Sequence, residues 1–241
     1  MLKRTLVLLA AAMVALTMSA TAAFAAIPAH PKFKSSAKEA TWHNSNFMFQ
    51  NDMWSCPQAA CGSQTIWADG PNNWGAEANM ANGNTAVLTY PDIARIFNNP
   101  RVSSFKLIRN GFTESMPRSK GVSAEAADDV WLDNYKIEMM MWVDNTGRSL
   151  AGSTHLGSAV IYGQHIGVYR YGSSEYIFNL PGHETSGETH ILSGIRWLQN
   201  HGYAPSNATV TNVQFGWEIA STGGKSVDFH VSKFWLHTSR N

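Results

Sequence analysis

Short apolar or alternating runs, separated by Gly, Pro, Asn and Ser, dominate this chain. Each run has the length of a strand, and many such runs in succession predict an all-β sandwich. Residues 189–200 differ, because Ile191, Ile195 and Leu198 recur at helical spacing before Gly202, which predicts one short helix. The clearest predicted strands are 86–90, 104–108, 136–143, 158–162, 167–171 and 211–219.

The amino terminus has the composition of a targeting segment. Lys3 and Arg4 precede an apolar run over residues 6–16, and Ala23-Phe24-Ala25 has the small-x-small pattern that a signal peptidase recognises. The pattern predicts a secretory signal over residues 1–25. The apolar run is too short for a membrane span, and a buried N-terminal helix is the alternative.

The sequence after the predicted signal suggests a short leader and then one domain. Residues 26–40 contain Pro28, Pro31 and several small or charged residues, which predict a flexible leader. No long linker, internal repeat or low-complexity tract follows. We therefore expect residues 41–241 to form a single β-sandwich domain, a size that suits one large sandwich.

Composition favours a neutral ligand. Only 15% of the residues are charged, and the formal net charge of +1 becomes −1 without Lys3 and Arg4. This balance gives no reason to expect nucleic acid or membrane as a partner. The nine tryptophans, with many Asn and Gln, favour a carbohydrate, although tryptophans that serve only as core are equally consistent. We expect a monomer that needs no cofactor.

The two cysteines and nine histidines are candidates for a disulfide bond and for metal ligands, respectively. In an exported protein, Cys56 and Cys61 are expected to form one disulfide that closes a small loop. The histidines show no H-x-x-x-H or similar pairing, so we predict no metal site.

One carboxylate stands out on the predicted strand 136–143. Side chains alternate between the two faces of a strand, so Ile137, Met139, Met141 and Val143 share a core face. On the other face lie Glu138, Met140 and Trp142. A carboxylate between apolar side chains needs partners, and the aromatic neighbour suggests a cleft. An ordinary exposed Glu on the wet side of a strand is equally consistent.

A second carboxylate has the same setting on the predicted strand 211–219. Val213, Phe215, Trp217 and Ile219 form its core face, and the other face carries Asn212, Gln214, Gly216 and Glu218. Two strands that each place one Glu on a polar or aromatic face meet the requirement of glycoside hydrolysis. Two unrelated surface glutamates remain the alternative on pattern alone.

A third strand, around residues 127–133, adds another acid. Asp129, Trp131 and Asp133 share one face, opposite Val130 and Leu132. An Asp beside a nucleophilic carboxylate can hold its geometry by sharing a proton and can separate the pKa values of two glutamates.

These segments together resemble glycoside hydrolase family 12. Glu138-Met139-Met140-Met141-Trp142 resembles the family's E-x-M-x-W nucleophile strand, and Phe215-Gly216-Trp217-Glu218 its F-G-T-E acid/base strand. Asp128-Asp129 resembles its Tyr-Asp pair, and Asn51-Asp52-Met53-Trp54 its N-N-x-W-G sugar-binding segment. The resemblance covers roughly residues 45–237 and includes the order of Gly62-Ser63-Gln64, Tyr90-Pro91 and the helix.

The resemblance implies a concanavalin-like jelly-roll sandwich with a concave cleft and retaining hydrolysis of β-1,4-glucan or xyloglucan. Glu138 would be the nucleophile, Glu218 the general acid/base, and Asp129 the residue that orients Glu138. Sugar contacts are expected from Asp52, Trp54, Met140, Trp142 and Gln214, and also from Trp74, whose neighbours are polar.

Several positions depart from the family pattern without removing the two glutamates. Asp52 replaces the second Asn, Ser55 a Gly, Asp128 a Tyr and Trp217 a small Thr. These changes affect the expected sugar contacts and leave the preferred glucan open. A carbohydrate-binding protein without turnover and a related jelly-roll xylanase are the alternative functions.

Overall fold

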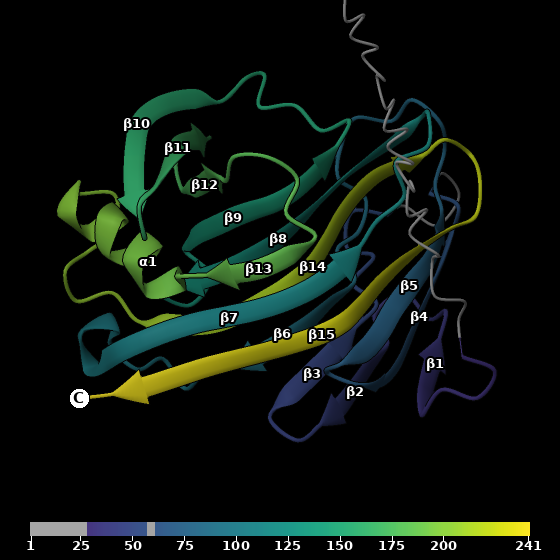
Figure 1. Cartoon of the computed structure of the whole chain (residues 1–241), viewed down its shortest axis with the longest axis horizontal. Helices are drawn as coiled ribbons and strands as arrows, with labels where there is room; N and C mark the ends of the chain where they lie inside the picture. Colours follow the sequence, from purple (N-terminus) through teal and green to yellow (C-terminus); the bar gives the residue numbers. More distant parts are fainter. Residues whose placement is uncertain (1–27, 57–60) are drawn as a thin grey trace, which may run out of the picture.

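Over the residues that the structure describes, the predicted all-β sandwich with one α-helix is confirmed. The computed structural model describes residues 28–56 and 61–241, so the signal expected over residues 1–25 lies outside the described residues. Two sheets face each other, and the helix lies at one end of the sandwich (Figure 1). Among the residues that the structure describes, no helix is long and apolar enough to cross a membrane.

The smaller sheet has six strands. In spatial order they are β1 (Phe33–Ser35), β4 (Ser63–Gly70), β5 (Asn73–Asn79), β15 (Val227–Arg240), β7 (Phe105–Ser115) and β13 (Ser186–Thr189).

The larger sheet has nine strands. In spatial order they are β10 (Thr154–Ile161), β11 (Gln164–Tyr171), β12 (Glu175–Asn179), β9 (Ile137–Thr146), β8 (Val122–Leu132), β14 (Val210–Thr222), β6 (Asp92–Ile96), β3 (Phe47–Gln50) and β2 (Thr41–Asn44). All named pairs in both sheets are antiparallel except β9 with β12, which run parallel.

Side-chain alternation on the central strands places the core as predicted. Met139, Met141 and Val143 of β9, with Phe215 and Trp217 of β14, are buried between the sheets. The bulky Trp217 belongs to this core, where its ring centroid lies 5.0 Å from that of Trp74 and 5.5 Å from that of Phe229. The opposite face of the same two strands is therefore left free for Glu138 and Glu218.

The helix, α1 (Ile191–Asn200), packs on the core side of β9. It begins two residues later than the predicted segment. Gly194 makes this packing close, since a Cβ atom there would lie 3.0 Å from the sulfur of Met139. Ile191, Ile195 and Leu198 are buried, as their spacing predicted.

Two expectations about local structure were wrong. Residues 86–90 form no strand, and only Thr89 makes an isolated bridge, with Ile219. Part of the segment expected to be a flexible leader joins a sheet, because β1 pairs with β4 through Phe33 and Ala68. The ring of Phe33 also stacks on that of Trp42 at 5.8 Å, so apolar contacts fix this segment.

A buried polar cluster connects the two sheets. Asp128 of β8 is fully buried and accepts hydrogen bonds from the amide of Asn110 on β7 and the hydroxyl of Thr189 on β13. Burial raises the pKa of Asp128 to about 8, although both hydrogen bonds oppose the rise. The pKa of this acid is higher in the folded than in the unfolded protein, so its protonated form favours the folded state. Its contribution to the free energy of unfolding therefore decreases as pH rises from about 4 to about 8.

The variant Asp128→Asn should therefore make stability less dependent on pH. An amide mimics the protonated acid and keeps a hydrogen-bond partner for both neighbours. Urea unfolding would measure the free energy of unfolding at pH 5 and at pH 8. Between these two pH values, the decrease should be about 2–4 kcal/mol smaller for the variant than for the wild type. All other buried acids are common to both proteins, so an identical pH dependence would contradict this role for Asp128.

Candidate active site

The two glutamates predicted to be catalytic lie on the same face of the larger sheet. Glu138 is on β9 and Glu218 is on β14, and β8 runs between these two strands. Both side chains line an open cleft in two adjoining parts, of about 450 and 570 Å³. The parts share Trp54, Glu138 and Glu218, so the carboxylates lie where the two halves meet.

Asp129 lies on β8 between the glutamates and lines the first part of the cleft. It is 5% exposed, and its Oδ2 accepts a hydrogen bond of 3.0 Å from the indole N–H of Trp131. Its Oδ1 has no partner among the described residues. Burial and the charges of Glu138 and Glu218 raise the pKa of Asp129 well above its usual range, which favours the protonated acid.

Glu138 is in an acidic environment. Burial, followed by the charges of Glu175 and Glu218, raises the pKa of Glu138 to about 8. Glu175 is its direct partner on the parallel strand β12, and it lines the second part of the cleft. Because neighbouring carboxylates disfavour one another's ionised forms, this environment favours retention of a proton within the group.

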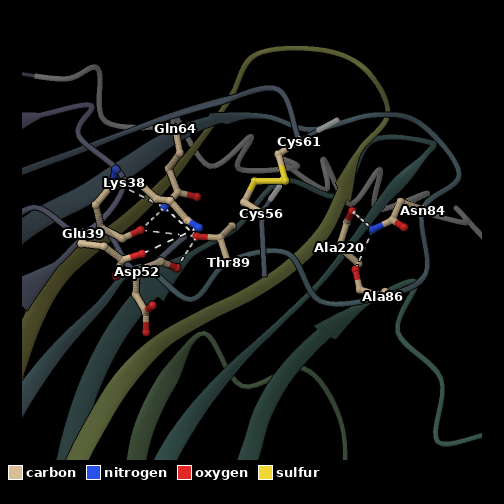
Figure 2. Close-up of a disulfide and its surroundings, with 11 residues drawn as sticks. Lys38, Glu39, Asp52, Cys56, Cys61, Gln64, Asn84, Ala86, Thr89 and Ala220 are labelled. Atoms are coloured by element: carbon tan, nitrogen blue, oxygen red, sulfur yellow. Dashed lines mark hydrogen bonds and ion pairs between the residues drawn. A yellow bond between two sulfur atoms is a disulfide. The ribbon is translucent and has the colours of Figure 1, made fainter. Parts of the chain in front are cut away.

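A well-anchored segment carries Asp52 and Trp54. Figure 2 shows the Cys56–Cys61 disulfide beside this segment, and the predicted pairing of the two cysteines is confirmed. The amide of Gln64 donates to the carbonyl of Asn51 (2.6 Å) and to the hydroxyl of Thr89 (2.9 Å). That hydroxyl in turn donates to the carbonyl of Asp52 at 2.7 Å.

These anchors hold two of the expected sugar contacts at the cleft. Trp54 is 58% exposed and lines both parts, so an aromatic face is open to a ligand. Asp52 lines the first part, where burial and the charge of Glu39 raise the pKa of Asp52 to about 6.

The other expected sugar contacts divide into three groups. Gln214 lines the first part of the cleft, and Trp142 lines the second. Met140 is on the same face but is 1% exposed, in a buried cluster with its neighbours Trp142 and Ile177. Trp74 was wrongly assigned to the cleft. It is fully buried in the core between Phe49 and Trp217, since its indole faces the other sheet despite its polar neighbours.

Gly216, on the face of β14 that carries Glu218, allows a close approach of protein backbone. A Cβ atom there would lie 2.2 Å from the carbonyl oxygen of Pro91 and 2.9 Å from the Cα of Asp92. The glycine therefore brings the edge of β6 close to β14.

Three charged residues near the glutamates were not identified from the sequence: Arg148 and Glu175, which line the second part of the cleft, and Glu125, which lines neither part. Glu125 lies opposite Glu218 in the β8–β14 ladder and is fully buried. Its position four residues before Asp129 on one strand places both on the same face, so alternation was a usable signal. Arg148 follows β9 in a turn, and nothing local indicates its contacts.

In the described ranges 28–56 and 61–241, no group of three or more His, Cys, Asp or Glu side chains is arranged to hold a metal ion. The cleft instead brings together carboxyl groups, one guanidinium and aromatic side chains. Such a set can supply a nucleophile, a proton donor and a stacking surface, which are the elements of acid/base chemistry on a sugar.

Comparison with solved structures supports this view of the fold. No protein-family model matches the sequence. A family 12 xyloglucanase from Bacillus licheniformis, in complex with ligand, is 20% identical with a TM-score of 0.75, over 86% of this chain and 100% of that chain. Endoglucanase 3 from Trichoderma harzianum, from family 12, is 21% identical with a TM-score of 0.76, over 89% and 100%.

A third structure has a different biological setting. The xyloglucanase domain of a type three effector from Sinorhizobium fredii, in complex with cellobiose, is 21% identical with a TM-score of 0.73, over 87% of this chain and 100% of that chain. At such identities the likeness establishes the fold, which is the predicted jelly-roll sandwich.

Proposed function

We propose that this chain is a secreted, retaining endo-β-1,4-glucanase of glycoside hydrolase family 12. The observation that carries the proposal is the position of Glu138 and Glu218 at the junction of the two halves of one open cleft. A cleft that extends to both sides of the carboxylates suits attack within a polymer. The fold shared with family 12 glucanases and xyloglucanases adds support.

In the first step of the proposed reaction, the Glu138 carboxylate attacks the anomeric carbon and forms a glycosyl-enzyme ester. Glu218 donates its proton to the departing glycosidic oxygen. In the second step, Glu218 takes a proton from water, the water oxygen attacks the same carbon, and Glu138 leaves. Two inversions give net retention.

Asp129 would keep Glu138 ionised for this attack. Asp129 is the more deeply buried of the two acids, and its Oδ1 has no partner among the described residues. Burial raises the pKa of Asp129 well above its usual range, and a proton held on Asp129 would be available for a hydrogen bond to Glu138.

The function is tested with a panel of soluble cellulose derivative, mixed-linkage glucan and xyloglucan. Product lengths should show internal cuts, and NMR of the first products should show the β-anomer before mutarotation. Release of the α-anomer first would exclude the retaining mechanism, and binding without products would favour a carbohydrate-binding protein. Sequencing of the exported protein should give an N-terminus after Ala25.

We expect Trp54→Ala to weaken polysaccharide binding more than catalysis. Loss of an exposed aromatic platform should raise KM about tenfold, as for a typical Trp contact at an interface, with kcat within about threefold. Steady-state kinetics on soluble glucan would measure both constants. Tyr162→Ala is the matched control, since Tyr162 is 74% exposed and lies outside both parts of the cleft. Equal KM values for the two variants would contradict the assignment.

A further inference from the structure

Arg148 makes polar contacts with three separate parts of the chain at the cleft. Its Nε donates to Oε2 of Glu125 at 2.5 Å, and its Nη1 donates to the carbonyl of Thr85 at 2.8 Å. Its Nη2 lies 3.8 Å from Oε2 of Glu218. The guanidinium also lies over the ring of Trp142, 6.0 Å from the centroid.

The backbone of Arg148 is fixed as well. Its N–H donates to Oδ1 of Asn145 at 3.0 Å, and the Asn145 amide donates back to the Arg148 carbonyl at 3.3 Å. The arginine side chain is only 14% exposed. A guanidinium held from both its backbone and its side chain has one orientation, which suits it to orient a neighbouring carboxylate.

Glu125 has no exposure to solvent and lies directly opposite Glu218 in the β8–β14 ladder. One of its oxygens is bonded to Arg148, and the other, Oε1, has no partner among the described residues. A buried carboxylate is retained only when it is paired, and the cation that pairs it here also faces Glu218.

We propose that Glu125 and Arg148 are positioning residues for Glu218, which orient its carboxyl group and balance its protonated and ionised forms between the two steps of catalysis. The inference rests on the proposed function of Glu218 as the acid/base. The negative charge of Glu125 favours the proton on Glu218 before attack, and Arg148 stabilises the Glu218 carboxylate after the proton has left.

Other titratable groups also face Glu218, and the variants used in the tests leave these residues unchanged. They are Tyr90 from the loop before β6, Asp129 on β8, Glu138 on β9 and Glu175 on β12. Burial and the charge of Glu218 raise the pKa of Glu125 well above its usual range, and the ion pair with Arg148 opposes this rise, so the negative charge of Glu125 depends on its contact with Arg148.

The first test is the pH profile of kcat/KM on soluble glucan for Glu125→Gln. This variant keeps an acceptor for Arg148 but leaves the cation without its counter-charge. Glu218 should then lose its proton more readily, so the basic limb of the profile should move to lower pH by on the order of one unit. The double variant Glu125→Gln/Arg148→Met removes both charges, and its basic limb should return toward the wild-type position.

Asp144→Asn is the matched control. Asp144 is a buried acid of β9 that pairs with Arg118 and with His183 Nδ1 (2.9 Å), outside both parts of the cleft. The basic limb of the kcat/KM profile of Asp144→Asn should remain at the wild-type position. An unshifted profile for folded Glu125→Gln, or a shift as large in Asp144→Asn, would overturn the proposal.

Arg148→Lys provides a second test if Glu125→Gln does not fold. Lysine keeps the charge, but its single ammonium cannot serve Glu125, Thr85 and Glu218 together. We expect kcat/KM on unactivated glucan to fall about tenfold, while kcat/KM on an activated aryl glycoside, which reports formation of the glycosyl-enzyme and needs no proton donor, changes little. Equal losses on both substrates would overturn the proposal. Full activity of Glu218→Ala on unactivated glucan would instead refute the acid/base assignment itself.

Discussion

Glu138→Gln is expected to abolish turnover of soluble β-glucan and to leave binding nearly unchanged. The amide has the shape of the carboxylate but cannot attack the anomeric carbon, so the covalent step is lost. We expect kcat to fall by roughly 10⁴-fold or more, in line with removal of other enzymatic nucleophiles. Reducing-end assays would measure turnover, and calorimetry with an oligosaccharide would measure binding.

The control for this experiment is Glu188→Gln. Glu188 is an exposed strand glutamate on β13 that pairs with Arg109 at 3.0 Å, away from the cleft. Its variant should retain wild-type turnover. A Glu138→Gln protein with activity within tenfold of the wild type would show that Glu138 is not the nucleophile, whatever the fold.

Glu218→Ala is expected to slow hydrolysis most for substrates whose leaving group must be protonated. Polysaccharide hydrolysis should fall by about 10²–10⁴-fold, because the glycosidic oxygen leaves poorly without general acid catalysis. Formation of the glycosyl-enzyme from a dinitrophenyl glycoside should change little, since that leaving group is stable as an anion. Pre-steady-state release of dinitrophenol would measure this step.

Azide offers an independent measurement on Glu218→Ala. The small anion can enter the space that the side chain vacates and attack the glycosyl-enzyme, which releases Glu138 and gives a β-glycosyl azide. NMR of the product would identify its anomeric configuration. Equal losses on polysaccharide and dinitrophenyl glycoside, with no azide product, would contradict the acid/base role.

Local sequence pattern predicted the faces of the central strands because alternation along a strand is a property of a few residues. Glu138 and Glu218 lie opposite a continuous apolar core, as expected. The same rule places Glu125 on the same strand face as Asp129, so the position of Glu125 could also be predicted from the sequence. Residues 86–90 have a similar apolar character but form no strand, since they make only one bridge, at Thr89.

Tertiary structure decided which faces meet and which residues become neighbours. Trp74 has polar neighbours in sequence, yet it lies in the core because β5 faces Phe49 and Trp217 of the other sheet. Asp128 replaces an aromatic residue of the family pattern, and its partners Asn110 and Thr189 come from two strands of the opposite sheet. Neither environment can be derived from residues nearby in the chain.

The sequence alone thus determined the fold class, the helix α1 and the side of the sheet that carries Glu138, Asp129 and Glu218, since these depend on local periodicity. Only the tertiary structure showed that Glu175 lies beside Glu138 and that Arg148 pairs with Glu125 next to Glu218. These pairs depend on strand order and register, which are set by burial of the whole core. The charges that surround the two glutamates are therefore a product of the fold.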